Sequence, residues 1–267
     1  MSALQRWDGF LAQIEGRHRQ VIADGEASIR QQIASIAGGG DVLPISHQLM
    51  AVKSRLQQLQ TMIPETWHAK VEDAIFADGH GVPERDAAWA KGEVLRHRMD
   101  DETEELEPRL LSELARQRFQ HAQAQHRPAR CAHCGAELAV GPAFRIVEVA
   151  CPCGARTAVE PSELMRSVAA VGTHALAQEQ ATQEWRAMRV AERRLHAIRP
   201  PRPLDVVVEY ERAQIAYWRR YLGARSQMEP ELARDPALEI RSRMEQWYTS
   251  GAEAEESWVR AGRPRQI

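Results

Sequence analysis

Four cysteines, the only ones in the chain, stand in two close pairs, Cys131-x-x-Cys134 and Cys151-x-Cys153. Thiol groups at such short spacing can act as a redox pair, form disulfides, or bind one metal ion together. A thioredoxin-type redox pair needs a β-α-β setting, which the helical pattern on both sides does not supply. Structural disulfides are not expected, because no secretory signal is visible and a reducing cytosol keeps thiols free. The sequence therefore predicts a metal site.

The residues around the pairs predict a small β module. A glycine follows each pair, Gly135 and Gly154, and permits the positive φ angle that a tight turn around a metal requires. The segments 137–140, 143–150 and 155–161 have the composition of short strands. We expect three strands with the four sulfurs at one end.

This pattern resembles a zinc ribbon, a module built from paired zinc knuckles, and the resemblance covers residues 128–161 only. It implies that the four cysteines named above are the ligands of one tetrahedral Zn²⁺, a closed site that is structural and not catalytic. The second pair departs from the ribbon pattern, because one residue and not two separates its thiols. A rubredoxin-like iron site would use the same sulfurs, and we expect zinc in preference to iron. His133 lies between two ligands and is expected to point away from the metal.

A module of this length buries too little apolar surface to fold alone, so the metal is expected to supply most of its stability. Outside the module, no histidine falls in a metal-ligand spacing and no glycine motif suited to phosphate binding is present. The sequence therefore offers no catalytic constellation, and we do not expect an enzyme.

Residues 1–127 form an N-terminal helical region in this reading. Apolar residues at spacings of three and four predict a helix from Ser2 to Ala37, ended by three glycines, and a second from Ser46 to Ile63. Pro64 is expected to end the second helix or to bend the chain into a short helix. Residues 78–86 read as a loop, and a long helix is expected over 84–126, kinked or split at Pro108.

Residues 162–267 form the C-terminal helical region. Ser162 can cap a long helix that is expected to run to about Ile198. The proline-rich segment 199–203 cannot be helical and is predicted to be a linker, with shorter helices after it over 204–222 and 236–248.

The predicted fold class is mainly α, with long helices that form an elongated bundle or an antiparallel coiled-coil stalk and with the zinc ribbon inserted between them. The stretches 84–126 and 162–198 flank the ribbon and are expected to run antiparallel. Long apolar stripes of this kind also favour self-association, so a homo-oligomer is one expected state.

The net charge of −2 gives no general attraction to polyanions, but residues 186–225 hold ten arginines against four acidic residues. Such a segment is usually a solvated helix face with internal ion pairs. No apolar run approaches the length of about 20 residues that a membrane span needs. We expect a cytoplasmic, non-enzymatic structural or adaptor protein that binds other proteins. The alternative is a nucleic-acid-associated zinc-ribbon protein that uses 186–225 to bind DNA or RNA.

Overall fold

The computed structural model describes residues 2–199, 202–229 and 235–250, with side chains as far as 246. The chain divides into two compact units, Met1–Ala124 and Gln125–Ile267, which are described here separately. The predicted mainly α fold with a small inserted β module is confirmed. The three-part division at 127/128 and 161/162, and the antiparallel pairing of 84–126 with 162–198, stay predictions. No helix among the described residues is long and apolar enough to cross a membrane.

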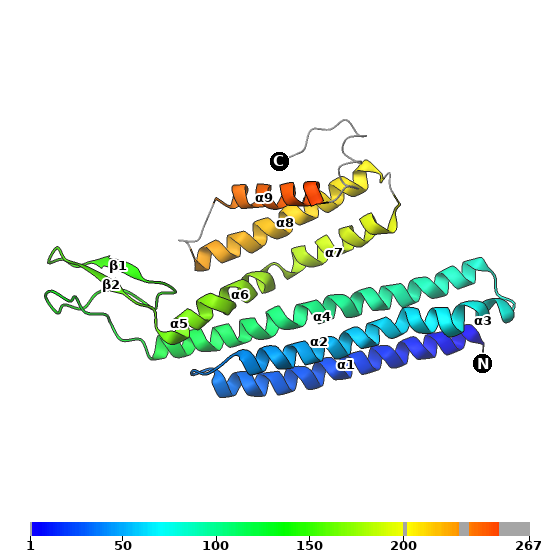
Figure 1. Cartoon of the computed structure of the whole chain (residues 1–267), viewed down its shortest axis with the longest axis horizontal. Helices are drawn as coiled ribbons and strands as arrows, with labels where there is room; N and C mark the ends of the chain where they lie inside the picture. Colours follow the sequence, from blue (N-terminus) through cyan, green and yellow to red (C-terminus); the bar gives the residue numbers. More distant parts are fainter. Residues whose placement is uncertain (1, 200–201, 230–234, 251–267) are drawn as a thin grey trace. The chain divides into compact units, whose positions relative to one another are not determined.

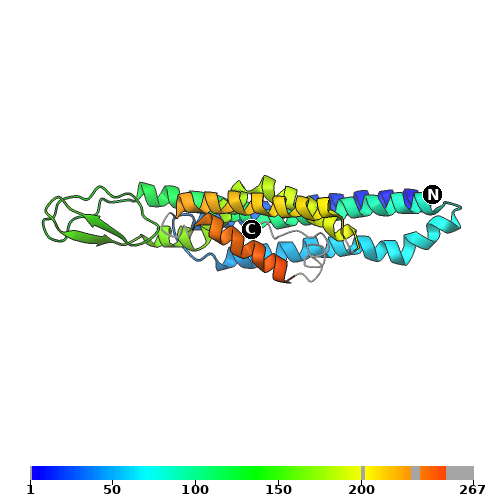
Figure 2. The same ribbon diagram turned by 90° about the horizontal axis from the view of Figure 1, so that it is seen from above.

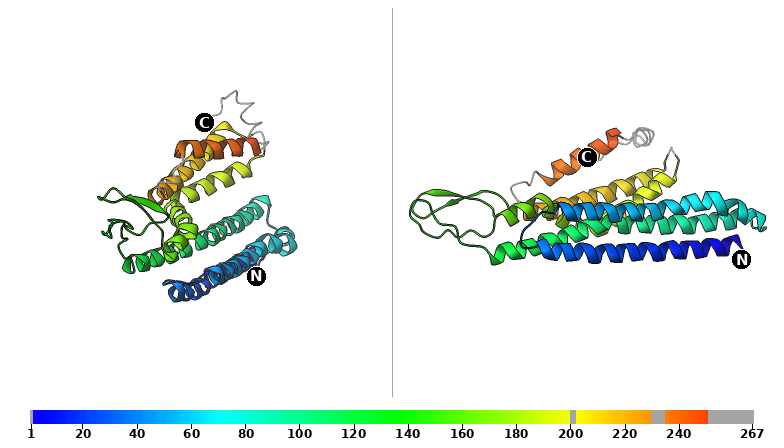
Figure 3. Two further views of the ribbon diagram at one scale, coloured as in Figure 1. Left: turned by 60° about the vertical axis from the view of Figure 1, so that its left-hand side comes forward. Right: turned by 60° about the horizontal axis from the view of Figure 1, so that its bottom comes forward.

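Unit 1 is built from three long helices, α1 (Ala3–Ile36), α2 (Leu43–Thr66) and α4 (Val82–Ala124), each of which packs against the other two. A π-helical segment, η1 (Trp67–Val71), and the short helix α3 (Glu72–Ala77) connect α2 to α4. The chain runs along α1, returns along α2 and runs out again along α4 (Figures 1 and 3). Helices α1 and α4 are therefore parallel, and α2 is antiparallel to both.

The two ends of α1 follow the sequence prediction. The Ser2 hydroxyl accepts a hydrogen bond from the Gln5 backbone N–H, and the Gln5 side chain accepts one from the Ser2 backbone N–H, which together form a capping box. Beyond the helix, Gly39 and Gly40 adopt φ angles of 139° and 125°, which residues with a side chain rarely adopt. These glycines end the helix and let the chain turn back into α2.

The expectation that Pro64 ends the second helix is wrong. Helix α2 continues through it to Thr66, and the backbone then widens into the π-helical turn of η1. A proline inside a helix removes one hydrogen-bond donor, so the carbonyl four residues before it loses that partner. The wider turn places both Trp67 and Val71 in the core, where they are 2% and 6% exposed.

Helix α4 begins and ends two residues earlier than predicted and has no break at Pro108. It begins at Val82, inside the segment predicted as a loop, because Pro83 lies in its first turn, where the missing N–H has no acceptor within the helix. The alternative of two abutting helices at Pro108 is wrong, because one helix runs from Val82 to Ala124, and the kink stays a prediction.

Ion pairs between α1 and α4 fix the register of the two parallel helices. Each pair joins residues separated by the same 83 positions. The pairs are Asp8–Lys91, Glu15–Arg98, Glu26–Arg109 and Arg30–Glu113. Pairs at exposed sites contribute at most about 1 kcal/mol each. We infer that the set selects one alignment of α1 along α4 more than it stabilises the bundle.

The core of unit 1 is closed at one end by Trp7, which is fully buried. Its indole Nε1 donates a hydrogen bond of 2.8 Å to the Ala88 carbonyl, and its ring meets the Trp67 ring edge-on at a centroid distance of 5.2 Å. Gly92 faces the same ring. A Cβ atom on Gly92 would lie 2.7 Å from Trp7 Cζ2, so the close approach of α1 to α4 here requires glycine.

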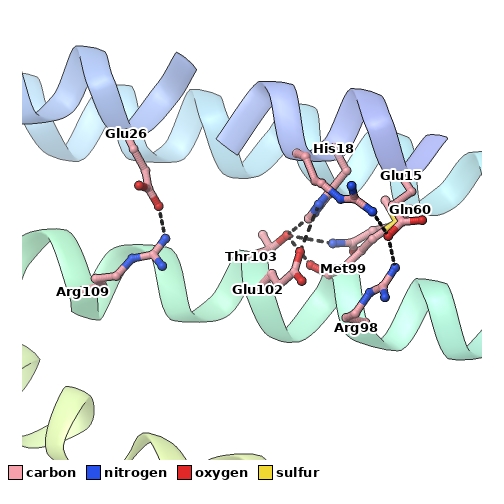
Figure 4. A network of polar contacts seen from close by, with 10 residues as sticks. Glu15, His18, Glu26, Gln60, Arg98, Met99, Glu102, Thr103 and Arg109 are labelled. Atoms are coloured by element: carbon pink, nitrogen blue, oxygen red, sulfur yellow. Dashed lines mark hydrogen bonds and ion pairs between the residues drawn. The ribbon is translucent and has the colours of Figure 1, made fainter. Parts of the chain in front are cut away.

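A buried polar layer crosses the middle of this core (Figure 4). The Gln60 amide donates to the Thr103 hydroxyl at 2.9 Å, and that hydroxyl donates to the Met99 carbonyl at 2.7 Å. His18, only 1% exposed, has one ring nitrogen 3.4 Å from the Thr103 hydroxyl and the other 3.4 Å from a Glu102 carboxylate oxygen. The layer thus connects all three long helices by hydrogen bonds.

The stability of unit 1 is expected to depend on pH through His18. Burial lowers the pKa of this imidazole below its ordinary value, against a smaller opposing effect of the Met99 carbonyl, while Arg98 and Glu15 act in opposite directions. As the pH falls, the unfolded chain takes up the proton first, near pH 6.5. The free energy of unfolding is therefore highest above that pH and falls as the pH drops through the folded-state pKa.

Hydrogen exchange of the α1 amides, measured in the full chain at about pH 7.5 and about pH 5.5, tests this. The variant His18→Gln is expected to lose most of the difference between the two conditions. An unchanged difference in that variant would contradict the role of His18.

Unit 2 starts its helical part as predicted, because the Ser162 hydroxyl accepts a hydrogen bond from the Met165 N–H. The prediction of one long helix from Ser162 to about Ile198 is wrong. Thr173 and Thr182 donate their hydroxyl protons to carbonyls three or four residues earlier, a contact that bends helices, and the chain breaks at Ala181. The segments are α5 (Glu163–Ser167), the π-helical η2 (Val168–Gly172), α6 (Thr173–Gln180) and α7 (Thr182–Ala197).

Two further helices of unit 2 lie in the described part of the chain, α8 (Leu204–Met228) and α9 (Pro236–Ser250), both longer than predicted. Helix α8 packs against α6, α7 and α9. Its aromatic residues Tyr217 and Tyr221 are 7% and 2% exposed and form a core with Ala177 of α6, with Ala181 and with Ala224. The predicted linker 199–203 lies between α7 and α8, and its residues 200 and 201 fall outside the described part of the chain.

Candidate metal centre

The first cysteine pair lies in a tight backbone turn. The Gly135 N–H donates to the Cys131 carbonyl at 2.9 Å, and the Cys131 N–H donates to the Ala136 carbonyl at 2.8 Å. Gly135 has a φ angle of 74°, as its place after the pair predicts. A single antiparallel bridge, Arg130 to Glu137, closes the base of the turn.

The second pair lies in an equivalent turn at the tip of a β-hairpin. Strand β1 (Val147–Ala150) pairs antiparallel with β2 (Arg156–Val159), as Figure 2 shows. Between them the Gly154 N–H donates to the Cys151 carbonyl at 2.9 Å, the Cys151 N–H donates to the Ala155 carbonyl at 2.9 Å, and Gly154 has a φ angle of 89°.

The predicted three-stranded sheet is corrected to two strands within the described residues. Segment 137–140 contributes one bridge residue and no strand. In this segment the Val140 N–H turns back to the Leu138 carbonyl, and the Val140 carbonyl lies 2.9 Å from His126 Nε2. Local contacts therefore occupy backbone groups that a third strand would need.

The two turns bring all four sulfur atoms together. Every pair of Sγ atoms lies within 4.8 Å, and two of the distances are 3.7 Å for Cys131 to Cys153 and 3.6 Å for Cys134 to Cys151. All four are free thiols. In a tetrahedral site with Zn–S bonds of about 2.3 Å, neighbouring sulfurs lie about 3.8 Å apart. The observed arrangement fits one ion held by four sulfurs.

Burial differs within each pair. Cys131 and Cys151 are 2% and 5% exposed and pack with Leu138 in a small apolar cluster, whereas Cys134 and Cys153 are exposed. Each of the two short sulfur–sulfur distances therefore joins a buried cysteine of one turn to an exposed cysteine of the other. An ion at the centre would connect the interior of the module to its surface.

The surroundings move the pKa values of the buried thiols in opposite directions. Backbone N–H groups of Cys134 and His133 point at the Cys131 sulfur and lower its pKa to about 6. At Cys151 the Cys153 N–H also favours the thiolate, but burial and the three neighbouring sulfurs outweigh it and raise the pKa to about 12. Four thiolates this close repel one another, and a bound cation removes that repulsion.

The structure brings together the four cysteines that the sequence predicts as ligands. Among the described residues, this cluster is the one that could hold a metal ion. His133 is exposed and is not part of the group. What the sequence did not reveal is the difference in burial within each pair, because that depends on the packing of Leu138 beneath the first turn.

The arginine-rich segment 186–225 carries much of its charge in local contacts. Arg189 and Arg194 form ion pairs within the segment, and Arg225 pairs with the residue four positions ahead. The partners are Glu192 at 2.6 Å, Glu209 at 2.5 Å and Glu229 at 3.2 Å. The Arg202 and Arg220 side chains donate to backbone carbonyls. These contacts neutralise or orient part of the positive charge.

Comparison with known proteins gives no family for this chain. No protein-family model matches it, and neither the curated proteins nor the solved structures include a significant match.

Gly135 offers a test of the turn geometry. The variant Gly135→Ala is expected to weaken metal binding about tenfold, because a side chain at positive φ costs roughly 1–2 kcal/mol. A Cβ there meets no atom within 4 Å, so the cost is confined to the backbone. Gly141→Ala is the matched control, since Gly141 is equally open and has no positive φ. Equal affinities of the two variants in a chelator competition would contradict the role of the turn.

Proposed function

We propose that the protein is a non-enzymatic structural or adaptor protein whose cysteine module is held together by one structural Zn²⁺. The observation that carries the proposal is the cluster of four sulfurs within 4.8 Å, presented by two glycine-ended turns. Four thiolates complete a tetrahedral shell, so the ion has no open position for a water molecule or a substrate. Such a site fixes a backbone and does not activate a reactant.

Zinc is the metal that the proposal names because closed tetrathiolate sites are typical of structural zinc. Iron would occupy the same four sulfurs in a rubredoxin-like centre and would give the protein a visible colour, whereas Zn²⁺ is colourless. Elemental analysis of anaerobically purified protein is expected to give one zinc per chain. Stoichiometric iron would contradict the identity of the metal. No bound metal, or disulfides among the four cysteines in mass spectra of freshly lysed cells, would contradict the site.

The adaptor role is supported by where the stability of the chain resides. The cores of unit 1 and of the helical part of unit 2 are formed by helices, and the cysteine module has only a small apolar cluster of its own. A rigid metal-bound module beside stable helices gives a fixed surface for a protein partner without any chemistry at the metal. We infer that protein partners, including a second copy of the chain, are the ligands of this protein.

The rival role is nucleic-acid binding through 186–225. The dependence of nucleic-acid binding on salt concentration distinguishes it from the adaptor role. We expect weak binding to mixed DNA and RNA, with little dependence on salt, because several arginines of the segment already have acidic or carbonyl partners. A fluorescence titration over a range of salt concentrations measures this. A log–log slope of about −4 or steeper would mean at least four phosphate contacts and would contradict the adaptor role.

A further inference from the structure

A cavity of about 480 Å³ lies between helix α8 and the first turns of helix α9. It shares no residue with the cysteine cluster. Helix α8 contributes Ile215 and Arg219 to its lining, and α9 and the residue before it contribute the rest. Those are Asp235, Pro236, Ala237, Ile240, Arg241 and Met244. The volume is within the range of about 300–1,000 Å³ that is common for small-molecule sites.

The floor of this cavity is apolar. Met244 is 2% exposed and belongs to the core cluster of α7, α8 and α9, and Ile215 and Ile240 pack against the same cluster. The floor therefore continues the interior of the unit out to the surface. A ligand seated on it would remove apolar surface from water, which is the main source of binding free energy for such a site.

The rim is positively charged. Arg219 and Arg241, one from each helix, are exposed and have neither an ion pair nor a hydrogen bond to any residue that the structure describes. Their neighbours differ in this respect. Arg243 stacks on the Trp218 ring at 3.9 Å and binds Glu239, and Arg220 donates to the Gln180 carbonyl.

Asp235, the acid among the described residues that line the cavity, forms no ion pair with these two cations. The Asp235 carboxylate accepts a hydrogen bond of 3.0 Å from the Ala237 N–H, and the Asp235 carbonyl accepts from the N–H groups of Leu238 and Glu239. The Asp235 carboxylate therefore caps the N-terminus of α9. The cavity combines an apolar floor with two guanidinium groups that are free to bind an anion.

We propose that this cavity binds a monomeric amphiphile that has an apolar chain and an anionic headgroup. The chain lies on Ile215, Ile240 and Met244, and the headgroup, a carboxylate or a phosphate, bridges Arg219 and Arg241. Guanidinium groups suit both headgroups because their paired N–H donors match two oxygens of either anion. This site goes beyond the proposed adaptor function and does not depend on it.

Isothermal titration of the full chain tests the proposal with three probes. Dodecanoate, kept below its micelle concentration, carries both the chain and the anion, acetate carries the anion alone, and dodecyltrimethylammonium carries the chain with the opposite charge. The expected result is one dodecanoate site per chain and no measurable binding of the other two. Binding of dodecyltrimethylammonium with equal affinity, or no binding of dodecanoate, would overturn the proposal.

Variants locate the site. The double variant Arg219→Gln with Arg241→Gln is expected to bind dodecanoate at least about tenfold more weakly. Arg212→Gln is the matched control, because Arg212 is an exposed arginine of α8 outside the cavity lining, and it is expected to change the affinity by less than about twofold. Equal losses in the two would show a general charge effect and overturn the assignment. Binding to phosphatidylglycerol vesicles without binding to monomeric dodecanoate or dodecyl phosphate would also overturn the assignment.

Discussion

Replacing Cys131 by serine is expected to remove the metal from the protein and unfold the cysteine module. Structural zinc contributes about 10–16 kcal/mol of apparent binding free energy in zinc-finger peptides, and a site that loses one of four thiolates loses much of it. The Cys131 side chain is buried in the small apolar cluster of the module and supplies one of the four sulfurs, so the loss extends to the fold. Elemental analysis is expected to fall from one metal per chain to below about 0.1.

The unfolding is expected to be local. Amides of β1 and β2 should lose their protection from hydrogen exchange, while amides of unit 1, which has its own core, keep theirs. His133→Ala is the matched control, because His133 lies within the same turn but is exposed and outside the cluster. A Cys131→Ser protein with full metal content and protected strands would refute the assignment of the four ligands.

The second large effect is expected from Trp7→Ala in unit 1. Truncation of a fully buried aromatic residue costs about 3–5 kcal/mol, because apolar contacts are lost and a cavity remains. Here the Ala88 carbonyl also loses its hydrogen-bond donor, and the packed face of Gly92 loses its partner. Native-state hydrogen exchange of the α1 and α4 amides gives the free energy of unfolding of this unit alone. A global unfolding curve of the whole chain would not, because it combines the contributions of both units.

Two variants show where the loss originates. Trp7→Phe keeps an aromatic ring but cannot donate to Ala88, so a cost of about 1–2 kcal/mol is expected beyond its smaller size. Val94→Ala removes an apolar side chain that is 70% exposed on the neighbouring helix and should change the free energy by less than about 0.5 kcal/mol. If Trp7→Ala cost no more than Val94→Ala, the position of Trp7 in the core would be wrong.

Much of the fold follows from local sequence signals. The cap of α1 at Ser2, the glycines after it and the cap of the second helical region at Ser162 are set by residues within a few positions of each boundary. The assembly of the four cysteines was predicted on the same basis, because each pair with its glycine specifies a turn of its own. Short-range chemistry of this kind can be read directly from one sequence.

The errors in the prediction arise where distant packing outweighs a local signal. Pro64 and Pro108 predict breaks, but the residues around them contribute to the core of a bundle that holds the helices together across both prolines. Conversely, Thr182 looks like an ordinary helical residue, and only the hydrogen bonds of its hydroxyl to earlier carbonyls accompany the break at Ala181. Neither result follows from helix propensity.

The parallel course of α1 and α4 has a mechanical consequence. Ala3 and Ala124, the first residue of α1 and the last of α4, lie at opposite ends of unit 1 (Figure 1). A pulling force applied between them acts along the helices and shears α1 past α4, so all the cross-helix charge pairs and the contacts of Trp7 bear the load together. Tension in that direction must break them at once, whereas a force that peels α1 away from one end would break them in turn.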